Sequence, residues 1–506
     1  MEIDDATCYR AVRSRDPRFD GRFYICVQTT GIYCRPICPA PPAKRENMRF
    51  LPCASAAEAA GFRPCRRCRP ETAPGTPGWL GTPATVSRAL RLIAAGALDE
   101  GNVDTLATRL GVGGRHLRRL FATHLGASPV AMAQTRRVHF ARRLLDDTTL
   151  SMTQVALEAG FSSVRRFNSA IRATFGQSPS ALRRQRPGSN GAVDVGIRLR
   201  LPYRPPYDWP SACAFLEPRT IPGVEECREG RYRRTVRLGD EPATIEIAAA
   251  GEGRHLELVI VCREPVELLE SAERARRLCD LDADPLAIDE HLSRDRKLAP
   301  LMKKRPGLRV PGAWDPFETA VRAVLGQQIS VAAAHTIAGR LAASCGRRLP
   351  DGSAPAGTSL SHLFPTPEQL ADADLSQLGL PQSRQETLRR LARAVCDGDL
   401  RFDGAMALED FVGQATRLPG IGPWSANYIA MRALGEPDAF PGGDLGLRKA
   451  MSRGEDLISA RDLERRAEAW RPWRAYAAMH LWRSLADKKP IPRKRATRRR
   501  TATTTT

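Results

Sequence analysis

The sequence Leu418-Pro-Gly-Ile-Gly-Pro-Trp424 lies between two stretches of helical periodicity and predicts a helix-hairpin-helix. Its glycines permit the tight turn, and the amides that open the second helix can hold a DNA phosphate. Twenty residues after Trp424, the sequence Phe440-Pro-Gly-Gly-Asp444 places a carboxylate behind a segment rich in Gly and Pro. A hairpin that can bind the DNA backbone, followed by the carboxylate of Asp444, indicates a protein that carries out chemistry on DNA.

The chain around this motif has 506 residues, which is too many for one hydrophobic core and predicts several domains. Its 78 Lys and Arg against 56 Asp and Glu give a net charge of +22. Clustered cations gain free energy by displacing counterions from phosphate, so double-stranded DNA is the expected partner. An ordinary soluble protein rich in arginine is the alternative. Because no apolar run is long enough for a membrane span, we expect no membrane partner and a cytoplasmic, nucleoid-associated location.

Seven of the 13 cysteines lie in the first 68 residues, and four of these form two closely spaced pairs. The pairs occur in Thr30-Gly-Ile-Tyr-Cys34-Arg-Pro-Ile-Cys38 and Gly61-Phe-Arg-Pro-Cys65-Arg-Arg-Cys68. Two thiol pairs at such spacing can surround one tetrahedral Zn²⁺, so the sequence predicts a closed zinc site. The other three, Cys8, Cys26 and Cys53, are expected to be buried or incidental.

The helical segment between residues 85 and 184 contains a repeat in which an alanine and a glycine follow at the same spacing, and each pair leads to an Arg-rich helix. The matching residues are Ala107, Gly111 and Arg115 in the first unit and Ala156, Gly160 and Arg165 in the second. A glycine turn before a basic amphipathic helix suits a helix-turn-helix, whose second helix enters the major groove. Two such units in tandem favour a DNA-binding domain over a plain helical bundle.

Changes in periodicity divide the chain, because strand-like alternation replaces the helical pattern after residue 195 and helices return from about residue 265. Segments rich in Pro, Gly and Ser at 74–78 and 186–191 predict linkers. We expect a multidomain α+β protein. Its parts are a small zinc domain (1–78), an all-α tandem helix-turn-helix (82–186), an antiparallel β-sheet with helices (195–292), an all-α helix-hairpin-helix domain (293–487) and a basic disordered tail (488–506).

The sequence around the four cysteines closely resembles the N-terminal domain of Ada-type proteins, which repair methyl phosphotriesters in DNA. The resemblance implies that Cys34 accepts the methyl group as a zinc-bound thiolate. It implies zinc ligands at Cys34, Cys38, Cys65 and Cys68, and DNA-backbone contacts at Thr30, Arg63 and Arg67. Pro41 stands where the family can carry an Arg, so one backbone contact is expected to be missing.

The resemblance continues into the tandem repeat, which looks like the AraC-type DNA-binding domain of Ada proteins, and then stops. No Pro-Cys-His-Arg motif follows, so we expect no site for O6-alkylguanine repair. The rest of the chain resembles AlkA-type 3-methyladenine DNA glycosylases of the helix-hairpin-helix superfamily. The matching stretches are Ala320-Val-Arg-Ala-Val-Leu-Gly-Gln-Gln-Ile-Ser330, Trp424-Ser-Ala-Asn-Tyr-Ile429 and Trp470-Arg-Pro-Trp-Arg-Ala-Tyr-Ala-Ala-Met-His-Leu-Trp482.

A glycosylase takes the target nucleotide out of the stack and holds its base in a pocket. Alkylated purines are electron-poor, so the aromatic faces of Trp424, Trp482 and Tyr428 are candidate pocket walls, with core packing as the alternative. Asp444 is the candidate general base or stabiliser of the oxocarbenium-like state, with an ordinary helix N-cap as the alternative.

Two departures bear on mechanism. Members of the superfamily that also cut the strand carry a Lys where this chain has Trp424, so we expect a monofunctional hydrolase. Gln328 stands where the family can carry a Leu that fills the gap left by the flipped base. The resemblance therefore does not fix which damaged bases this chain accepts. Gly420 and Gly422 are expected to contact the DNA backbone.

We therefore expect a 3-methyladenine-type glycosylase fused to a zinc-dependent, methyl-accepting regulator of transcription. An activator whose glycosylase half is only an inactive DNA clamp is the alternative, and a uracil or oxidised-base glycosylase is a third reading. RNA polymerase is a candidate partner, and a monomer is expected.

Overall fold

The computed structural model describes residues 3–75, 84–99, 101–184, 196–251, 253–350, 352–452 and 456–487. Most of the linker expected at 74–78, the whole of that at 186–191 and the tail expected at 488–506 lie outside these ranges. We refer to residues 3–184 as the N-terminal half and to residues 196–487 as the C-terminal half. No helix in the described ranges is long and apolar enough to cross a membrane.

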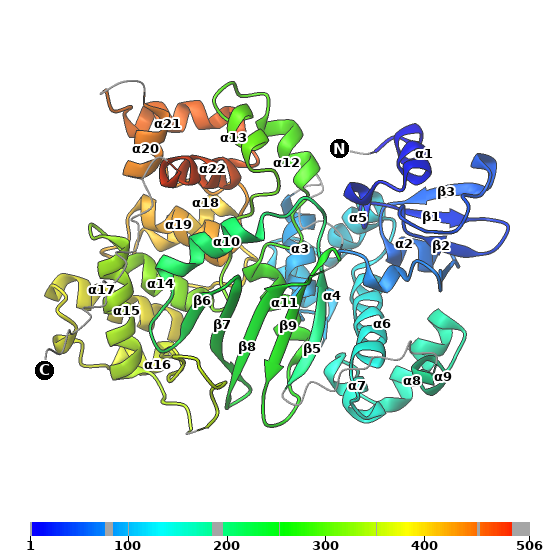
Figure 1. Cartoon of the computed structure of the whole chain (residues 1–506), viewed down its shortest axis with the longest axis horizontal. Helices are drawn as coiled ribbons and strands as arrows, with labels where there is room; N and C mark the ends of the chain where they lie inside the picture. The colour runs from blue at the N-terminus through cyan, green and yellow to red at the C-terminus, as the bar shows by residue number, and fades with distance from the viewer. Residues whose placement is uncertain are drawn as a thin grey trace, which may run out of the picture.

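The N-terminal module is a small sheet with strand order β3-β1-β2-β4, flanked by two helices (Figure 1). Phe23, Ile25 and Met48 form its core with one face of the first helix. Cys8, Cys26 and Cys53 are buried, as expected. The elements are α1 (Asp5–Ser14), β1 (Tyr24–Val27), β2 (Ile32–Cys34), β3 (Met48–Leu51), α2 (Ala54–Ala59) and β4 (Arg63–Pro64).

The repeat forms two helix-turn-helix units joined by one long helix, which confirms the tandem arrangement. Gly111 and Gly160 take left-handed backbone conformations, with φ of 70° and 79°, at the two turns. Asn102 and Ser151 cap the first helix of each unit through capping boxes. The helices are α3 (Ala84–Ala94), α4 (Val103–Arg109), α5 (Gly114–Leu125), α6 (Pro129–Asp147), α7 (Met152–Glu158), α8 (Val164–Phe175) and α9 (Pro179–Arg184).

The C-terminal half begins with an antiparallel sheet of strand order β5-β9-β8-β7-β6. Its strands alternate or run apolar, because one face packs on helices and on the core that continues into the helical domain. The strands are β5 (Ile197–Pro202), β6 (Glu225–Arg228), β7 (Arg231–Leu238), β8 (Glu241–Ala249) and β9 (His255–Val261), with α10 (Trp209–Leu216) between the first two. Periodicity anticipates β5, β7 and β9; β6 and β8 were not predicted.

The remaining helices form the domain that carries the hairpin, and the expected multidomain α+β class is confirmed (Figure 1). The helices are α11 (Leu268–Leu278), α12 (Pro285–Leu292), α13 (Ala299–Lys304), α14 (Pro316–Leu325), α15 (Val331–Cys345), α16 (Pro367–Ala371), α17 (Gln382–Cys396), α18 (Leu408–Ala415), α19 (Pro423–Ala433), α20 (Leu445–Met451), α21 (Ala460–Ala467) and α22 (Arg474–Ala486).

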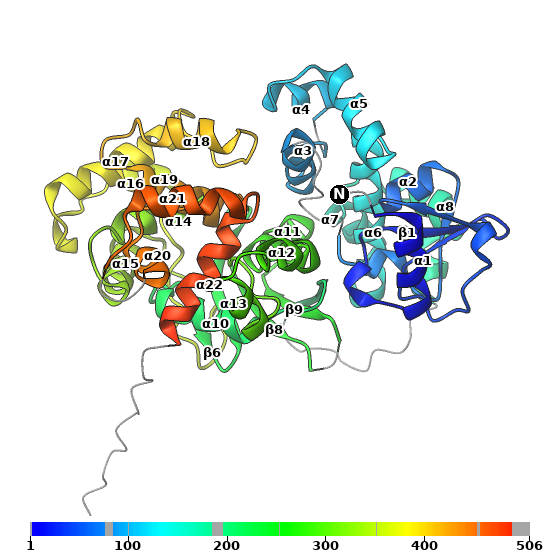
Figure 2. The same ribbon diagram turned by 90° about the horizontal axis from the view of Figure 1, so that it is seen from above.

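The two halves lie side by side (Figure 2), and both apolar and polar contacts join them. The Arg22 guanidinium pairs with Asp284 at 2.9 Å, and both side chains are largely buried. The Leu268 amide at the start of α11 donates to the Glu158 carboxylate at the end of α7, at 2.9 Å. The halves are therefore docked rather than only tethered.

Candidate metal centre and active site

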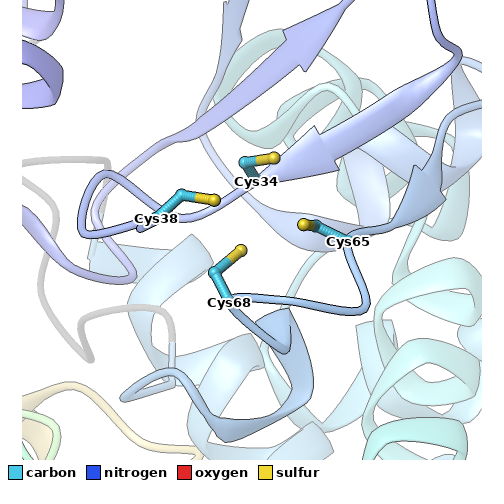
Figure 3. Close-up of side chains that lie close together, drawn as sticks. All are labelled: Cys34, Cys38, Cys65 and Cys68. Carbon is cyan, nitrogen blue, oxygen red and sulfur yellow. The ribbon is translucent and has the colours of Figure 1, made fainter. Parts of the chain in front are cut away.

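Four cysteine sulfurs converge where two loops leave neighbouring strands. Cys34 ends β2 and Cys65 follows β4, and the parallel pairing of these strands brings the two pairs together. The four Sγ atoms all lie within 4.8 Å of one another (Figure 3). Four sulfurs with no oxygen donor make a set that Zn²⁺ accepts in closed tetrahedral sites, so the residues fit this ion. The N-terminal module binds Zn²⁺, as the sequence predicts.

The Arg35 side chain holds one side of this centre in place. Its backbone amide donates to the Cys68 sulfur at 3.3 Å, and its guanidinium donates to the Cys68 carbonyl at 3.1 Å. The same guanidinium forms a buried ion pair with Asp20. Burial acts to lower the pKa of Arg35, but the carboxylate of Asp20 raises it further, so the residue stays charged.

The four sulfurs differ in access, which bears on which of them could react. Cys65 and Cys68 are buried, at 8% and 7% exposure, whereas Cys34 and Cys38 are only half-buried. The hydrogen bond from the Arg35 backbone amide also holds the Cys68 sulfur in place. Exposure therefore restricts a nucleophilic role to Cys34 and Cys38, and does not choose between them.

The residues expected to contact the DNA backbone near this centre are all exposed, but they face different neighbours. Arg67 lies between two ligands and lines a cleft toward the C-terminal half. Arg63 lies beside the end of α8, where a Cβ built on Gly176 would come within 3.5 Å of an Arg63 nitrogen. Thr30 lies in the turn between β1 and β2, where its hydroxyl is 3.4 Å from the Val27 carbonyl.

Asp444 lies between two indoles in the C-terminal half. The Trp482 Nε1 donates to its Oδ1 at 2.8 Å, and the Trp424 Nε1 donates to its Oδ2 at 3.2 Å. Its Oδ1 also accepts the Leu447 amide at 2.9 Å, so Asp444 is the N-cap of α20. The helix-cap alternative therefore holds, and it coexists with a carboxylate that faces a cavity.

The aromatic residues that were predicted for the pocket do come together around this carboxylate. The Trp424 and Tyr428 rings stack, with centroids 5.3 Å apart and planes inclined by 11°. The Tyr428 and Trp482 rings lie 6.3 Å apart. All three side chains and Asp444 line one cavity of about 260 Å³.

The sequence did not predict that the β-sheet domain also lines this cavity. Phe215 from the end of α10 stacks on Trp482 at 6.5 Å, and the Arg219 guanidinium lies 4.0 Å from the centre of the Phe215 ring. Both residues line the cavity, although more than 200 residues separate them from Trp424 and Asp444. No local motif marks them, because only the tertiary fold brings them there.

A group of arginines sets the electrostatics of the cavity. The Arg432 guanidinium donates to the Tyr428 hydroxyl oxygen at 2.9 Å. Burial acts to raise the pKa of Tyr428, but the charges of Arg432, Arg219 and Arg322 outweigh it and lower that pKa below its ordinary value. The positive charges therefore strengthen the hydroxyl as an acceptor.

The hairpin between α18 and α19 has the geometry that its glycines predict. Gly420 has φ of 95°, and a Cβ there would collide with Thr387 at 2.1 Å, so only glycine fits. Gly422 is the exposed N-cap of α19, with open space around it. The Gln327 side chain donates to the Gly420 carbonyl at 2.8 Å and ties the neighbouring loop to the hairpin. The next residue, Gln328, is exposed with φ of 57°.

Comparison with known families agrees with this architecture in four consecutive segments. The metal binding domain of Ada matches residues 7–71, and a helix-turn-helix domain matches 106–185. The AlkA N-terminal domain matches residues 198–315, and the HhH-GPD superfamily base excision DNA repair protein matches 321–475.

Curated relatives resemble either the whole chain or one of its halves. A protein of Escherichia coli K12, "DNA-3-methyladenine glycosylase 2", is 35% identical over 56% of this chain and 95% of its own length. "Bifunctional transcriptional activator/DNA repair enzyme Ada" of the same strain is 37% identical over 39% of this chain, which corresponds to 53% of the relative. "Probable bifunctional transcriptional activator/DNA repair enzyme AlkA" of Mycobacterium tuberculosis H37Rv is 43% identical over 96% of this chain and 97% of its own length. The chain therefore belongs to the AlkA-type family of bifunctional transcriptional activators and DNA repair enzymes.

Proposed function

We propose that this protein removes alkylated bases from DNA by hydrolysing the N-glycosidic bond in its C-terminal half. Its N-terminal half is a zinc-dependent DNA-binding regulator of transcription. The observation that carries the first statement is the Asp444 carboxylate, which is held by two indole N–H groups and lines an aromatic cavity. RNA polymerase as a further partner, a monomeric state and the domain boundaries given above are parts of the same proposal.

In this mechanism the hairpin amides and the glycines at 420 and 422 hold the DNA backbone while the base enters the cavity. Trp424 and Tyr428 offer a stacked aromatic wall for an electron-poor base. As the glycosidic bond breaks, positive charge develops on the sugar, and Asp444 stabilises it and accepts a proton from the attacking water. Because Trp424 offers no amine, no Schiff base forms at that position.

Gln328 is the proposed occupant of the gap that the flipped nucleotide leaves. It is exposed and takes a left-handed backbone conformation in the loop that Gln327 ties to the hairpin. A polar wedge can hydrogen-bond the orphaned partner base, but it fills the stack less well than Leu.

The deciding experiment is base release from methylated duplex DNA by the full chain and by the Asp444→Asn variant. Asn caps a helix as well as Asp does, so the cap of α20 is kept while the negative charge and the acceptor of the Trp424 N–H are lost. We expect release to fall by about a hundredfold or more, the scale for losing one electrostatic stabiliser, with DNA affinity nearly unchanged.

The matched control is Asp315→Asn, because Asp315 is the N-cap of α14 and accepts the Phe317 amide at 2.8 Å. It should retain full activity. Equal activity of Asp444→Asn and wild type would show that the carboxylate has no catalytic role. A wild-type chain without base release would favour the inactive clamp, and a borohydride-trapped adduct would contradict monofunctional hydrolysis.

We also propose that Cys34 accepts a methyl group from a methyl phosphotriester. Bound zinc keeps the cysteine sulfurs as thiolates at neutral pH. The Cys34 sulfur forms a bond to the methyl carbon while the bond from carbon to phosphate oxygen breaks, which leaves a thioether and a phosphodiester anion. The half-buried position supports Cys34 or Cys38, and the Ada-type motif selects Cys34. Mass spectrometry after reaction with methyl-phosphotriester DNA should place 14 Da, about the mass of one added CH₂, on Cys34.

A further inference from the structure

A cleft of about 760 Å³ lies between the metal-bearing module and the sheet of the C-terminal half. Cys68, Arg67 and the α6 residue Arg143 line it from the N-terminal half. Arg200 of β5 and Arg254, which precedes β9, line it from the C-terminal half. No residue of this cleft lines the cavity at Asp444, so the two are separate places on the molecule.

The cleft carries an excess of positive charge, because six arginines and two aspartates line it. Arg35 pairs with Asp20, and Arg69 pairs with Asp146 from α6. Arg67, Arg200 and Arg254 are exposed. None of these three forms an ion pair within 4.0 Å with a carboxylate of the described residues.

The charges of the two sheet arginines reach into the gap between the halves. Burial first, and then the charge of Arg200, lowers the pKa of His255 below its ordinary value, and His255 also lines the cleft. The pKa of Asp16 in the N-terminal module is lowered mainly by its hydrogen bonds with Arg18, and Arg254 contributes across the gap. Glu257 lies opposite Arg200 in the strand register but pairs with Arg198, which leaves Arg200 without a carboxylate partner among the described residues.

We propose that this cleft is a DNA-backbone site, in which Arg200 and Arg254 bind phosphates that neighbour the one presented to Cys34. Cys34 does not itself line the cleft, but its sulfur lies within 4.8 Å of the sulfur of Cys68, which does, so a strand in the cleft comes near the proposed methyl acceptor. The glycosylase half thereby becomes part of the surface on which the N-terminal module engages DNA. Only the identity of the central phosphate rests on the proposed methyl transfer.

A phosphodiester strand is the ligand that this arrangement fits. Guanidinium groups bind phosphate oxygens with two parallel hydrogen bonds, and arginines on both walls can hold successive phosphates of one strand. A free anion could use the same groups, but a strand also gains from counterion release at each contact.

The test compares the full-length wild type with an Arg200→Gln/Arg254→Gln double variant. The matched control is Arg228→Gln/Arg231→Gln. It removes two exposed arginines from the β6–β7 hairpin, at the opposite edge of the same sheet. Affinity for an undamaged duplex is measured between 50 and 300 mM salt, where each lost contact lowers the slope of log K against log salt by about 0.9. We expect the cleft variant to lose about 1.8 in slope, and the control to lose none.

Two further readouts locate the effect. Hydrogen exchange should show that DNA protects the segments 198–202 and 253–257 in wild type but not in the cleft variant. The rate of Cys34 methylation by a duplex with one methyl phosphotriester should fall about tenfold in the cleft variant only. Unchanged slope and exchange, an equal loss in the control, or stabilisation by free nucleotides without a change in DNA affinity would each overturn the proposal.

These outcomes distinguish a failure of the cleft proposal from a failure of the proposed function. If wild type fails to release bases or to methylate Cys34, the proposed function is wrong, but the slope and exchange still decide the cleft. If wild type performs both reactions and the cleft variant binds DNA as wild type does, only the cleft proposal fails.

Discussion

At the scale of single residues, Asp444 is both the N-cap of α20 and the carboxylate proposed for catalysis, two roles that the sequence presented as alternatives. It caps α20 through the Leu447 amide, and its two oxygens each accept an indole N–H. The cap fixes where the carboxylate lies, and the indoles fix how it is oriented. The structural role and the proposed chemical role are therefore compatible at this position.

The two indole bonds predict unequal effects of removing each N–H group. In Trp482→Phe the carboxylate loses the 2.8 Å bond, and in Trp424→Phe it loses the 3.2 Å bond, while an aromatic ring remains in both. A hydrogen bond to a charged group contributes about 1.5 to 3 kcal/mol, so single-turnover excision should slow at least about tenfold in Trp482→Phe. Trp424→Phe should slow it less. If excision were slower in Trp424→Phe than in Trp482→Phe, stacking on the base, and not the orientation of Asp444, would control the reaction.

Asp280 gives a prediction about pH. Burial raises the pKa of its carboxyl to about 6, although Arg309 and the Tyr476 hydroxyl oppose the rise. Because the folded pKa lies above the unfolded one, the folded state binds more protons between pH 4 and 6, and stability falls as the pH rises through this window. The loss is about 3 kcal/mol at most, from about two pKa units.

The Asp280→Asn variant should remove this loss. Tyr476 and the Val310 amide both donate to the same Oδ2 atom, and the side-chain oxygen of Asn can accept both bonds. Asn also tolerates the left-handed backbone found at this position, where φ is 51°. Urea unfolding at pH 4 and pH 7 measures the difference, and a variant with the same pH dependence as wild type would assign the effect to another group.

At the scale of elements, helix α2 connects the metal centre to the DNA-binding repeat. Its Glu58 carboxylate accepts the Tyr33 hydroxyl at 2.8 Å, beside the ligand Cys34, and the Thr135 hydroxyl of α6 at 2.6 Å. It also contacts His139 at 3.1 Å. Burial acts to raise the pKa of Glu58, but bonds from these three partners lower it below its ordinary value. The contact therefore favours the ionised form and holds β2 against α6.

Replacing Glu58 by Gln should loosen this connection, because the neutral amide accepts fewer and weaker hydrogen bonds. We expect a loss of about 1 to 3 kcal/mol in the free energy of unfolding at pH 7. The Glu46→Gln variant, at an exposed position of the same module, is the control and should lose nothing measurable. Calorimetry tests both, and equal stabilities of the two variants would mean that the Glu58 contact contributes nothing.

Zinc removal belongs to the same scale. The full chain should contain about one Zn²⁺, and the Cys65→Ala/Cys68→Ala variant should contain none, because two remaining sulfurs cannot close a tetrahedral site. Metal analysis after dialysis measures both. Full zinc retention in the double variant would place the ion elsewhere.

Much of the fold at this scale could be predicted from local signals. The Gly turns at 111 and 160, the Cys pairs and the Gly420 hairpin all depend on residues close in sequence. Strand β6 was missed because its alternation is interrupted by Glu225, an acidic residue that becomes buried only through partners such as Arg234 and Arg322. Phe215 and Arg219 were missed in the cavity for a related reason, since periodicity carries no information on contacts between domains.

At the scale of the whole molecule, α3, the helix that precedes the two helix-turn-helix units, docks on the two segments that flank the hairpin helices. Arg88 of α3 donates to the Ala405 carbonyl at 2.8 Å, ahead of α18. Arg91 of α3 forms an ion pair with Glu436, behind α19. Ala405 is buried in the same apolar cluster as Leu92 of α3. The sequence predicted the domains correctly in kind, but it contained no signal for this docking.

A charge exchange tests the docking. Arg91→Glu or Glu436→Arg alone places like charges together at a partly buried interface and should separate the halves, with a larger radius of gyration in X-ray scattering. The double variant restores an ion pair of reversed polarity, so the compact form should return, with a coupling energy of about 1 to 3 kcal/mol. Additive effects of the two changes would show that Arg91 and Glu436 do not interact in solution.

The buried pair of Arg22 and Asp284 has a consequence for inheritance. One member is encoded near the start of the gene and the other beyond its midpoint, and each loses its counter-charge if the reading frame is divided between them. A gene for either half alone would therefore encode a protein with an uncompensated charge at a formerly covered face. Both charges would then face water, and the two separate products would regain the ion pair only by binding each other, whereas the fusion keeps the partners together.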